Sequence, residues 1–436
     1  MFNYYLGLAL RSLKRNVVLT ALMISAIGVG IGASMTVFTV LRTMSADPIP
    51  SKSSKLFAAT IDNFGPDRDQ PKGIIRDQVS YHDAAAWLAA RRGLRQTAMY
   101  AVSISVLPAA ENAKPFTLSA RAATADFFSM FDVPFRAGQG WSQTEDDDRA
   151  NVVVINSRLA ERLFPRSDAL GKTINMDQHD YRVVGVTGEW NPQPRYYDVT
   201  SNGAYSEADE AFIPFSTAIA RQIQSDGNNN CNEAPPPGWE GHLNSECVWL
   251  QFWVELPTPR AERDYRQFLA NYAAEQKQIG RFHWDAETIL DDVPTWLAYQ
   301  KVVPQEMRVS SLVAGGFLLV CLINSVGLML AKLTGRASEL GVRRALGASK
   351  AEIFVQCLVE SAVVGLAGGL LGLSLTKLGL IVERTILTDD MARLAHLNPG
   401  AVIITLCLSI VATMCSGLYP SWRASRVQPA WQLKAQ

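Results

Sequence analysis

Three short segments of this sequence carry residue types that could do chemistry, and each lacks part of the pattern that its chemistry needs. Leu170–Thr173 reads LGKT, like the end of a phosphate-binding P-loop, but Arg166 stands where the first glycine of that motif must lie. Glu145–Asp148 is acidic but has neither the spacing nor the glycine of an EF-hand. Gly28–Gly32 reads GVGIG inside an apolar run, which excludes a dinucleotide site.

The common catalytic and metal-binding motifs are also missing from the sequence. It contains no G-x-S-x-G, H-E-x-x-H or C-x-x-C motif and only five histidines. Nucleophilic and metal-assisted chemistry usually needs one of these arrangements of residues. The sequence therefore argues against an enzyme, and it predicts neither a metal site nor a cofactor bound by this chain.

Cys231 and Cys247 are the two of the six cysteines that lie outside long apolar runs. The segment between them is rich in proline, glycine and asparagine. A lone pair of cysteines in an oxidising compartment most simply forms a disulfide. The alternative is a metal site that also uses His242, but a structural zinc site needs four ligands and only three candidates are at hand. We expect the disulfide.

Four apolar stretches are long enough to cross a bilayer as helices: residues 17–41, 309–331, 353–376 and 397–422. About 20 apolar residues are needed for such a crossing. Three of these stretches contain no charged residue, and residues 353–376 contain only Glu360. Buried helices of a soluble protein are the alternative, as is a cleaved signal peptide for the first stretch, which is longer than such peptides allow. We expect a membrane protein with four transmembrane helices.

Basic residues predict the orientation of these spans. Residues 1–16, 332–352 and 423–436 lie on one side of a four-span protein and together hold eleven basic and two acidic residues. Residues 377–396 hold three of each. The positive-inside rule therefore places the three basic segments and both termini in the cytoplasm. Residues 42–308 then form a large domain on the outside, with residues 377–396 as a short loop there.

The large domain reads as a mixture of strands and helices. Residues 42–308 hold 27 basic and 35 acidic residues, a net charge of −8, which makes nucleic acid a poor partner. The β-branched run Val152–Ile155 passes directly into a helical pattern, and residues 177–180 form a polar turn between two strands. Such alternation predicts an α+β domain inserted between the first and second spans. A segment of this length can bury its own core, and we expect two subdomains.

Residues 332–352, which we call the basic loop, read as a helix, a stop and a second helix. Glu339 and Arg343 are four residues apart, the favourable order for an ion pair along a helix. Gly347 is a natural helix stop. Ser349 and Glu352 then match the S-x-x-E capping box that begins a new helix.

Three further features concern the helices themselves. Glu360 lies about two turns into the third span, where a carboxylate is costly unless it is paired or near the interface. Gly28 and Gly32 form a G-x-x-x-G pair, which allows close helix packing in a membrane. Residues 1–16 are amphipathic and basic, which predicts a helix lying in the membrane interface.

The basic loop and the large domain resemble a known family. The sequence ASELGVRRALGASKAEIFVQCLVES is similar to the signature loop of FtsX-like permeases, membrane subunits of ABC transporters. The segments VVVINSRLAERLF, LGKTI and YRVVGVTG resemble the MacB-like periplasmic core domain. The order of one span, a large domain and three spans also fits, so the resemblance covers nearly the whole chain.

The resemblance implies a mechanotransmission permease of the bacterial inner membrane, whose basic loop is a coupling helix that docks on an ATPase. Because this sequence has no nucleotide motif, an ATPase dimer with its own ATP and magnesium is expected on a separate chain. A second copy of the permease or a related permease, a periplasmic adaptor and an outer-membrane channel are further implied partners. The residues at coupling positions are Glu339, Gly341, Arg343, Arg344, Gly347 and Lys350.

The resemblance leaves the cargo open. It favours export of peptides, antibiotics or other amphiphiles. The alternatives are a permease of the LolC/LolE type, which releases lipoproteins, and an FtsX-like regulator of a periplasmic hydrolase, which moves no substrate. The segment between Cys231 and Cys247 departs from the family pattern and is a candidate contact for a partner.

Overall fold

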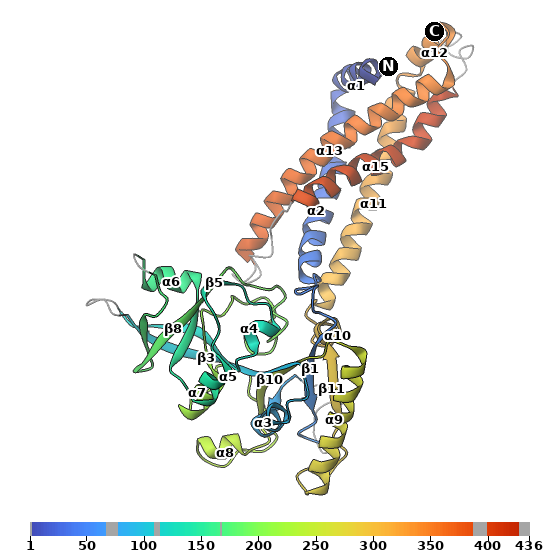
Figure 1. Cartoon of the computed structure of the whole chain (residues 1–436). Helices are drawn as coiled ribbons and strands as arrows, with labels where there is room; N and C mark the ends of the chain where they lie inside the picture. The colour runs from blue at the N-terminus through green and yellow to red at the C-terminus, as the bar shows by residue number, and fades with distance from the viewer. Residues whose placement is uncertain (1, 67–76, 109–113, 166–167, 387–398, 427–436) are drawn as a thin grey trace. The chain divides into compact units, whose positions relative to one another are not determined.

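Two separate units make up the chain in the computed structural model (Figure 1). The structure describes residues 2–66, 77–108, 114–165, 168–386 and 399–426. One unit, the helical unit, comprises Met1–Ser45 and Val303–Gln436. The other, the large domain, comprises Ala46–Val302.

Four long apolar helices dominate the helical unit, and each is long and apolar enough to cross a membrane. Its helices are α1 (Phe2–Arg15), α2 (Val17–Met44), α11 (Gln305–Thr334), α12 (Ala337–Ala345), α13 (Lys350–Ile386) and α15 (Pro399–Ser425). The long helix α13 packs against both α2 and α15, and α11 packs against α2 and α15. This arrangement confirms the four-span prediction.

The helices extend beyond the apolar stretches from which they were predicted. Helix α11 begins at Gln305, and α13 continues to Ile386. Residues 377–386, expected in a loop, are therefore helical, because a helix need not end where its apolar run ends. Residues 387–396 of that loop and residues 427–436 of the tail lie outside the described part of the chain.

Gly28 and Gly32 lie where α2 packs against α13. A Cβ atom on Gly28 would come within 2.8 Å of the Leu371 side chain, and one on Gly32 within 2.8 Å of Leu375. The carbonyl oxygen of Gly372 lies 3.3 Å from the same Gly32 position. The two glycines thus let the backbones of α2 and α13 meet, as close helix packing in lipid requires.

The large domain is built on one mixed sheet. Its strands are β1 (Leu56–Ile61), β2 (Val79–Ser80), β3 (Arg95–Leu107), β4 (Phe116–Ala123), β5 (Phe135–Gly138), β6 (Val152–Asn156), β7 (Thr173–Met176), β8 (His179–Thr187), β9 (Ala211–Pro214), β10 (Val248–Glu255) and β11 (Thr288–Asp292). Its helices are α3 (Tyr81–Ala90), α4 (Phe127–Met130), α5 (Gln143–Asp147), α6 (Ser157–Leu163), α7 (Phe215–Ala220), α8 (Trp239–Leu243), α9 (Pro259–Gln278) and α10 (Val293–Tyr299).

Among the described residues, the main path of the sheet runs β11-β1-β10-β3-β4-β9-β6-β8-β5. The pairs β4–β9 and β6–β8 are parallel, and the other pairs on this path are antiparallel. Mixed pairing with helices between the strands confirms the predicted α+β class.

Local sequence signals explain where these elements begin and turn. The side chain of Asn156 accepts a hydrogen bond from the backbone nitrogen of Leu159 at 2.7 Å, which caps α6 as predicted. Asp177 and Gln178 have φ angles of 46° and 66° between β7 and β8. Two positive φ angles are the signature of a two-residue hairpin turn, so the predicted hairpin is confirmed.

The sheet carries a hydrophobic cluster on each face. Along β6, Val153 and Ile155 belong to one cluster and Val152 and Val154 to the other, because alternate side chains of a strand point to opposite faces. The sequence predicts two subdomains. The structure has one sheet that separates two cores and belongs to a single compact unit.

Cys231 and Cys247 are joined in a disulfide across 16 residues of sequence, as predicted. Cys247 is buried and directly precedes β10, and Asn230 forms a β-bridge with Val248. The disulfide therefore closes the segment that contains α8 onto the start of β10. Closing a loop of this length stabilises a fold by about 3 kcal/mol when the crosslink restricts the unfolded chain.

Replacing both cysteines with serine should therefore lower the unfolding free energy of the large domain by about 3 kcal/mol, measured by urea unfolding. In mass mapping of the unreduced, denatured protein, Cys231 and Cys247 should escape alkylation until a reductant is added. The free Cys407 and Cys415 provide the internal control, since they should react without reductant. Alkylation of Cys231 and Cys247 before reduction would show that the bond is absent.

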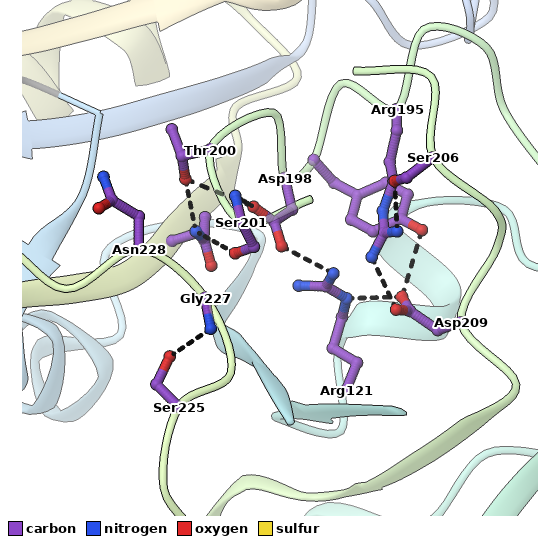
Figure 2. Close-up of polar contacts among 12 residues, drawn as sticks. Arg121, Arg195, Asp198, Thr200, Ser201, Ser206, Asp209, Ser225, Gly227 and Asn228 are labelled. Atoms are coloured by element: carbon purple, nitrogen blue, oxygen red, sulfur yellow. Dashed lines mark hydrogen bonds and ion pairs between the residues drawn. The ribbon is translucent and has the colours of Figure 1, made fainter. Parts of the chain in front are cut away.

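A cluster of buried charges lies inside the large domain (Figure 2). Arg121 on β4 contacts Asp198 at 2.8 Å and Asp209 at 2.7 Å, and Arg195 contacts Asp209 at 2.6 Å. All four side chains are at most 1% exposed, and Tyr197 lies beneath both guanidinium groups. The two positive and two negative charges balance, and they fasten the segment between β8 and β9 to β4.

Candidate functional site

The basic loop has a fixed shape because both of its helix boundaries are closed by hydrogen bonds. Helix α12 ends at Ala345, and Gly347 two residues later has a φ of 103°. The backbone nitrogens of Gly347 and Ala348 donate to the carbonyl oxygens of Arg344 and Arg343, each at 3.1 Å. These two bonds form a Schellman motif, the usual glycine-based end of a helix.

The next helix, α13, begins at Lys350 with the predicted capping box. The backbone nitrogen of Ser349 donates to the Glu352 carboxylate at 2.8 Å, and the nitrogen of Glu352 donates to the Ser349 hydroxyl at 3.2 Å. Each residue thus satisfies an otherwise free backbone donor of the other. The loop is therefore a rigid helix, stop and helix rather than a slack connection.

The outer face of α12 is apolar. Leu346 is 83% exposed and Val342 is 51% exposed, and Ala345 beside them is also exposed. Lys350 is exposed at the first residue of α13. We call Val342, Ala345 and Leu346 the apolar face. A large hydrophobic side chain that is exposed on a short polar loop is common at protein interfaces.

Three of the four charged residues predicted to couple, Glu339, Arg343 and Arg344, contact their own chain, whereas Lys350 is exposed. Arg343 donates to Gln356 at 3.0 Å and pairs with Glu339 at 3.1 Å. Arg344 donates to the carbonyl oxygen of Ser425 on α15 at 3.3 Å. Gly341 is buried on the inner side of α12. Glu339, Gly341, Arg343 and Arg344 therefore hold the loop on the helices, and the apolar face is what the loop presents outward.

Glu360 is buried, and two cations pair with it. Its carboxylate lies 2.6 Å from the ammonium of Lys332 and 3.2 Å from the guanidinium of Arg336. It also accepts a hydrogen bond from the hydroxyl of Ser12 on α1. Lys332 in turn donates to Thr20 on α2 at 3.2 Å. These partners explain how a carboxylate can sit inside an apolar helix.

Glu339 extends this cluster to the surface of the unit. Its carboxylate lies 3.3 Å from Arg336 and 2.8 Å from Arg15 on α1. Partial burial alone would raise the pKa of Glu339, but the hydrogen bond from Arg336 and the charges of Arg336, Arg343 and Arg15 lower it. Glu339 is therefore ionised at neutral pH and attracts all three cations.

Sequence reasoning found Glu360 and missed its partners. No local pattern pairs Lys332 or Arg336 with Glu360, which lies at least 24 positions away in the sequence. Ser12 gave no signal because serine is common on helix surfaces. One side of helix α1 also packs within the helical unit, since Ala9 and Ser12 are buried there.

The segments with catalytic residue types have structural roles. Leu170–Thr173 forms a turn and the first residue of β7, with φ of 76° at Gly171. Asp146 of the acidic run is buried and accepts hydrogen bonds from the backbone nitrogens of Ala125 and Ser216. Burial raises the pKa of Asp146 to about 6, although these hydrogen bonds oppose the shift. Within the described ranges, no group of three His, Cys, Asp or Glu residues could hold a metal ion.

Comparison with known proteins decides the family. Residues 20–260 match the family model of the MacB-like periplasmic core domain, and residues 311–429 match that of the FtsX-like permease C-terminal region. The chain belongs to the MacB-like, FtsX-like family of ABC transporter permeases. Both matches cover permease parts, and the second includes the basic loop.

Curated relatives align with this permease along almost all of its length. The macrolide export ATP-binding/permease protein MacB of Escherichia coli K12 is 26% identical over 435 residues, and its counterpart in Shigella flexneri is 25% identical. Each alignment covers 98% of this chain and 60% of the relative. The permease thus spans about three fifths of the length of these relatives.

Solved structures of soluble regions show a weaker likeness. The periplasmic region of MacB from Actinobacillus actinomycetemcomitans aligns with 59% of this chain and 96% of its own, at 14% identity and a TM-score of 0.37. The extracellular domain of the noncanonic ABC-type transporter YknZ from Gram-positive bacteria covers 54% of this chain and 99% of its own, at 10% identity and a TM-score of 0.34.

Proposed function

We propose that this permease is the membrane subunit of a mechanotransmission ABC transporter whose ATPase is a separate chain. The observation that supports the proposal most strongly is the apolar face of α12, held outward by a rigid loop between two apolar helices. An ATPase dimer that binds ATP and magnesium would dock there and push the loop as it closes. The push would move the spans as rigid bodies and with them the large domain.

The proposed orientation follows from the charges. The three basic segments would lie in the cytoplasm, where the ATPase and its ATP are found. The large domain would lie outside the inner membrane, in an oxidising compartment that suits the Cys231–Cys247 disulfide. Two permease copies, or this permease and a related one, would flank the ATPase dimer.

The proposed cargo is a peptide, an antibiotic or another amphiphile, delivered with a periplasmic adaptor and an outer-membrane channel. The support is the likeness to relatives named as macrolide exporters, which leaves the cargo class broad. Release of lipoproteins and regulation of a periplasmic hydrolase are the alternatives that the same family permits. The partners that accompany the permease distinguish the three.

Native mass spectrometry of the complex purified from its own membrane tests this proposal. We expect two permease chains with two copies of an ATP-binding protein, together with an adaptor. A bound lipoprotein would instead favour lipoprotein release, and loss of hydrolase activity on deletion of the permease would favour regulation. ATP hydrolysis by the purified permease without any partner would contradict the proposal itself.

A further inference from the structure

An unbroken series of alternating charges runs through the helical unit from the end of α11 to α1. It begins at Lys332, passes through Glu360 and Arg336, and continues through Glu339 to Arg15, with distances of 2.6, 3.2, 3.3 and 2.8 Å between successive partners. We call these five residues the charge chain. They come from α1, α11, α12, α13 and the short link before α12.

Helix α1 joins the charge chain at two points. Arg15 pairs with Glu339 on α12, and the buried hydroxyl of Ser12 both donates to Glu360 and accepts from Arg336. Only Asn16 separates α1 from α2, the first long apolar helix. A displacement of α12 would therefore pull on α1 and, through it, on α2.

Stability alone does not account for this cluster. Lys332 and Glu360 are at most 1% exposed, and taking such a pair of charges out of water carries a large desolvation penalty. Well-packed apolar residues of similar volume are often as stabilising or more so. Ion pairs form only when two helices are aligned so that their charged groups meet. A helix that moves must therefore move the helices whose charges pair with its own.

We propose that Glu360 and Arg336 are positioning residues that make α1 part of the coupling unit. Movement imposed on α12 then reaches α2 through α1, in addition to the direct connections of α12 to α11 and α13. The inference rests on the proposed function for the source of the movement. The connection between α1 and the charge chain can be tested without an ATPase.

The test uses the double variant Glu360→Gln/Lys332→Met, which removes one positive and one negative charge and leaves Arg336 paired with Glu339. The full complex is placed in lipid nanodiscs, and amide hydrogen exchange of α1 and α12 is measured with and without ATP and magnesium. In the wild-type complex, exchange of both helices should change on ATP addition. In the double variant, exchange of α12 should still change, but the change in α1 should be smaller than in the wild type, because only Arg15 and the Ser12–Arg336 hydrogen bond still join α1 to the charge chain. Permease-dependent ATP hydrolysis should fall about tenfold.

The control is Arg136→Met/Glu161→Gln, which removes an exposed ion pair of the large domain. It should behave as the wild type. ATPase copurification should be normal in both double variants, which separates a loss of coupling from a loss of assembly. A Glu360→Gln/Lys332→Met complex with wild-type exchange of α1 and wild-type hydrolysis would overturn the inference and leave the proposed function intact.

A second variant keeps the test decisive if the double variant does not fold. Ser12→Ala removes the hydroxyl that ties α1 to Glu360 and Arg336 and leaves every charge in place. In the purified permease alone, α1 amides of this variant should exchange about tenfold faster than in the wild type. Unchanged exchange of α1 in Ser12→Ala would overturn the inference, whether or not an ATPase binds the permease. If no ATPase copurifies with the wild-type permease, that result would instead contradict the proposed function.

Discussion

Replacing Leu346 with glutamate should detach the ATPase from the permease without unfolding either unit. Leu346 is 83% exposed at the end of α12, so a charged side chain fits there in the free permease. In the complex, the same side chain would be buried against the ATPase. A central hydrophobic contact of an interface contributes about 2 kcal/mol or more, and an unpaired buried carboxylate adds a further penalty. We expect affinity to fall at least about 30-fold.

The affinity is measured by titrating the ATPase against the permease in nanodiscs, with hydrolysis as a second readout. Leu94→Glu is the matched control, since it makes the same substitution at a leucine of the large domain that is 60% exposed. That variant should bind the ATPase normally. Normal binding by Leu346→Glu as well would mean that the apolar face is not the docking surface.

The largest expected effect on stability comes from Arg121 in the large domain. Arg121→Met leaves Asp198 without its guanidinium partner in a fully buried site (Figure 2). Breaking a buried pair by removing one partner typically costs about 3–5 kcal/mol. Arg136→Met is the control, because its pair with Glu161 is exposed and should contribute less than about 1 kcal/mol.

Tryptophan fluorescence reports this unfolding selectively. The sequence has 10 tryptophans, and only Trp422 and Trp431 lie outside the large domain. Urea unfolding followed by fluorescence should show the loss for Arg121→Met and little change for Arg136→Met. Equal stability of the two variants would show that the cluster does not hold the segment between β8 and β9 in place.

The unfolding free energy of the Arg121→Met variant should also depend on pH in a characteristic direction. Burial alone would raise the pKa of Asp198, but the charges of Arg121 and Arg195 lower it in the wild type. Without Arg121, burial dominates and the folded-state pKa should rise above the unfolded value of about 4. The variant should then regain stability as the pH falls toward about 4, because the folded state binds the proton more tightly.

Local patterns in the sequence were sufficient to predict much of the fold. The long apolar runs predicted α2, α11, α13 and α15, and the Asn156 cap and the turn at Asp177 predicted elements that the structure contains. Each of these signals depends on residues close together in the sequence. The order of strands in the sheet could not be predicted in this way, because residues that pair between β4 and β9, such as Ala120 and Ala211, lie 91 positions apart.

In the candidate site, too, the sequence predicted only the features that depend on neighbouring residues. Gly347, Ser349 and Glu352 predicted the shape of the basic loop because helix ends depend on neighbouring residues. The direction in which Arg343 and Arg344 point could not be predicted, since it depends on Gln356 and on the end of α15. The resemblance implies docking by those two arginines, and in the structure they contact Gln356 and Ser425 while Leu346 is exposed.

Photo-crosslinking from position 346 tests the central claim most directly. A photoreactive phenylalanine derivative is incorporated at Leu346 of the full-length permease and irradiated in its native membrane, and the products are identified by mass spectrometry. We predict a crosslink to an ATP-binding protein whose yield changes when ATP is supplied. Crosslinks to lipid or to the permease itself, with no ATP-binding protein among the products, would contradict the assignment of the basic loop as the coupling site.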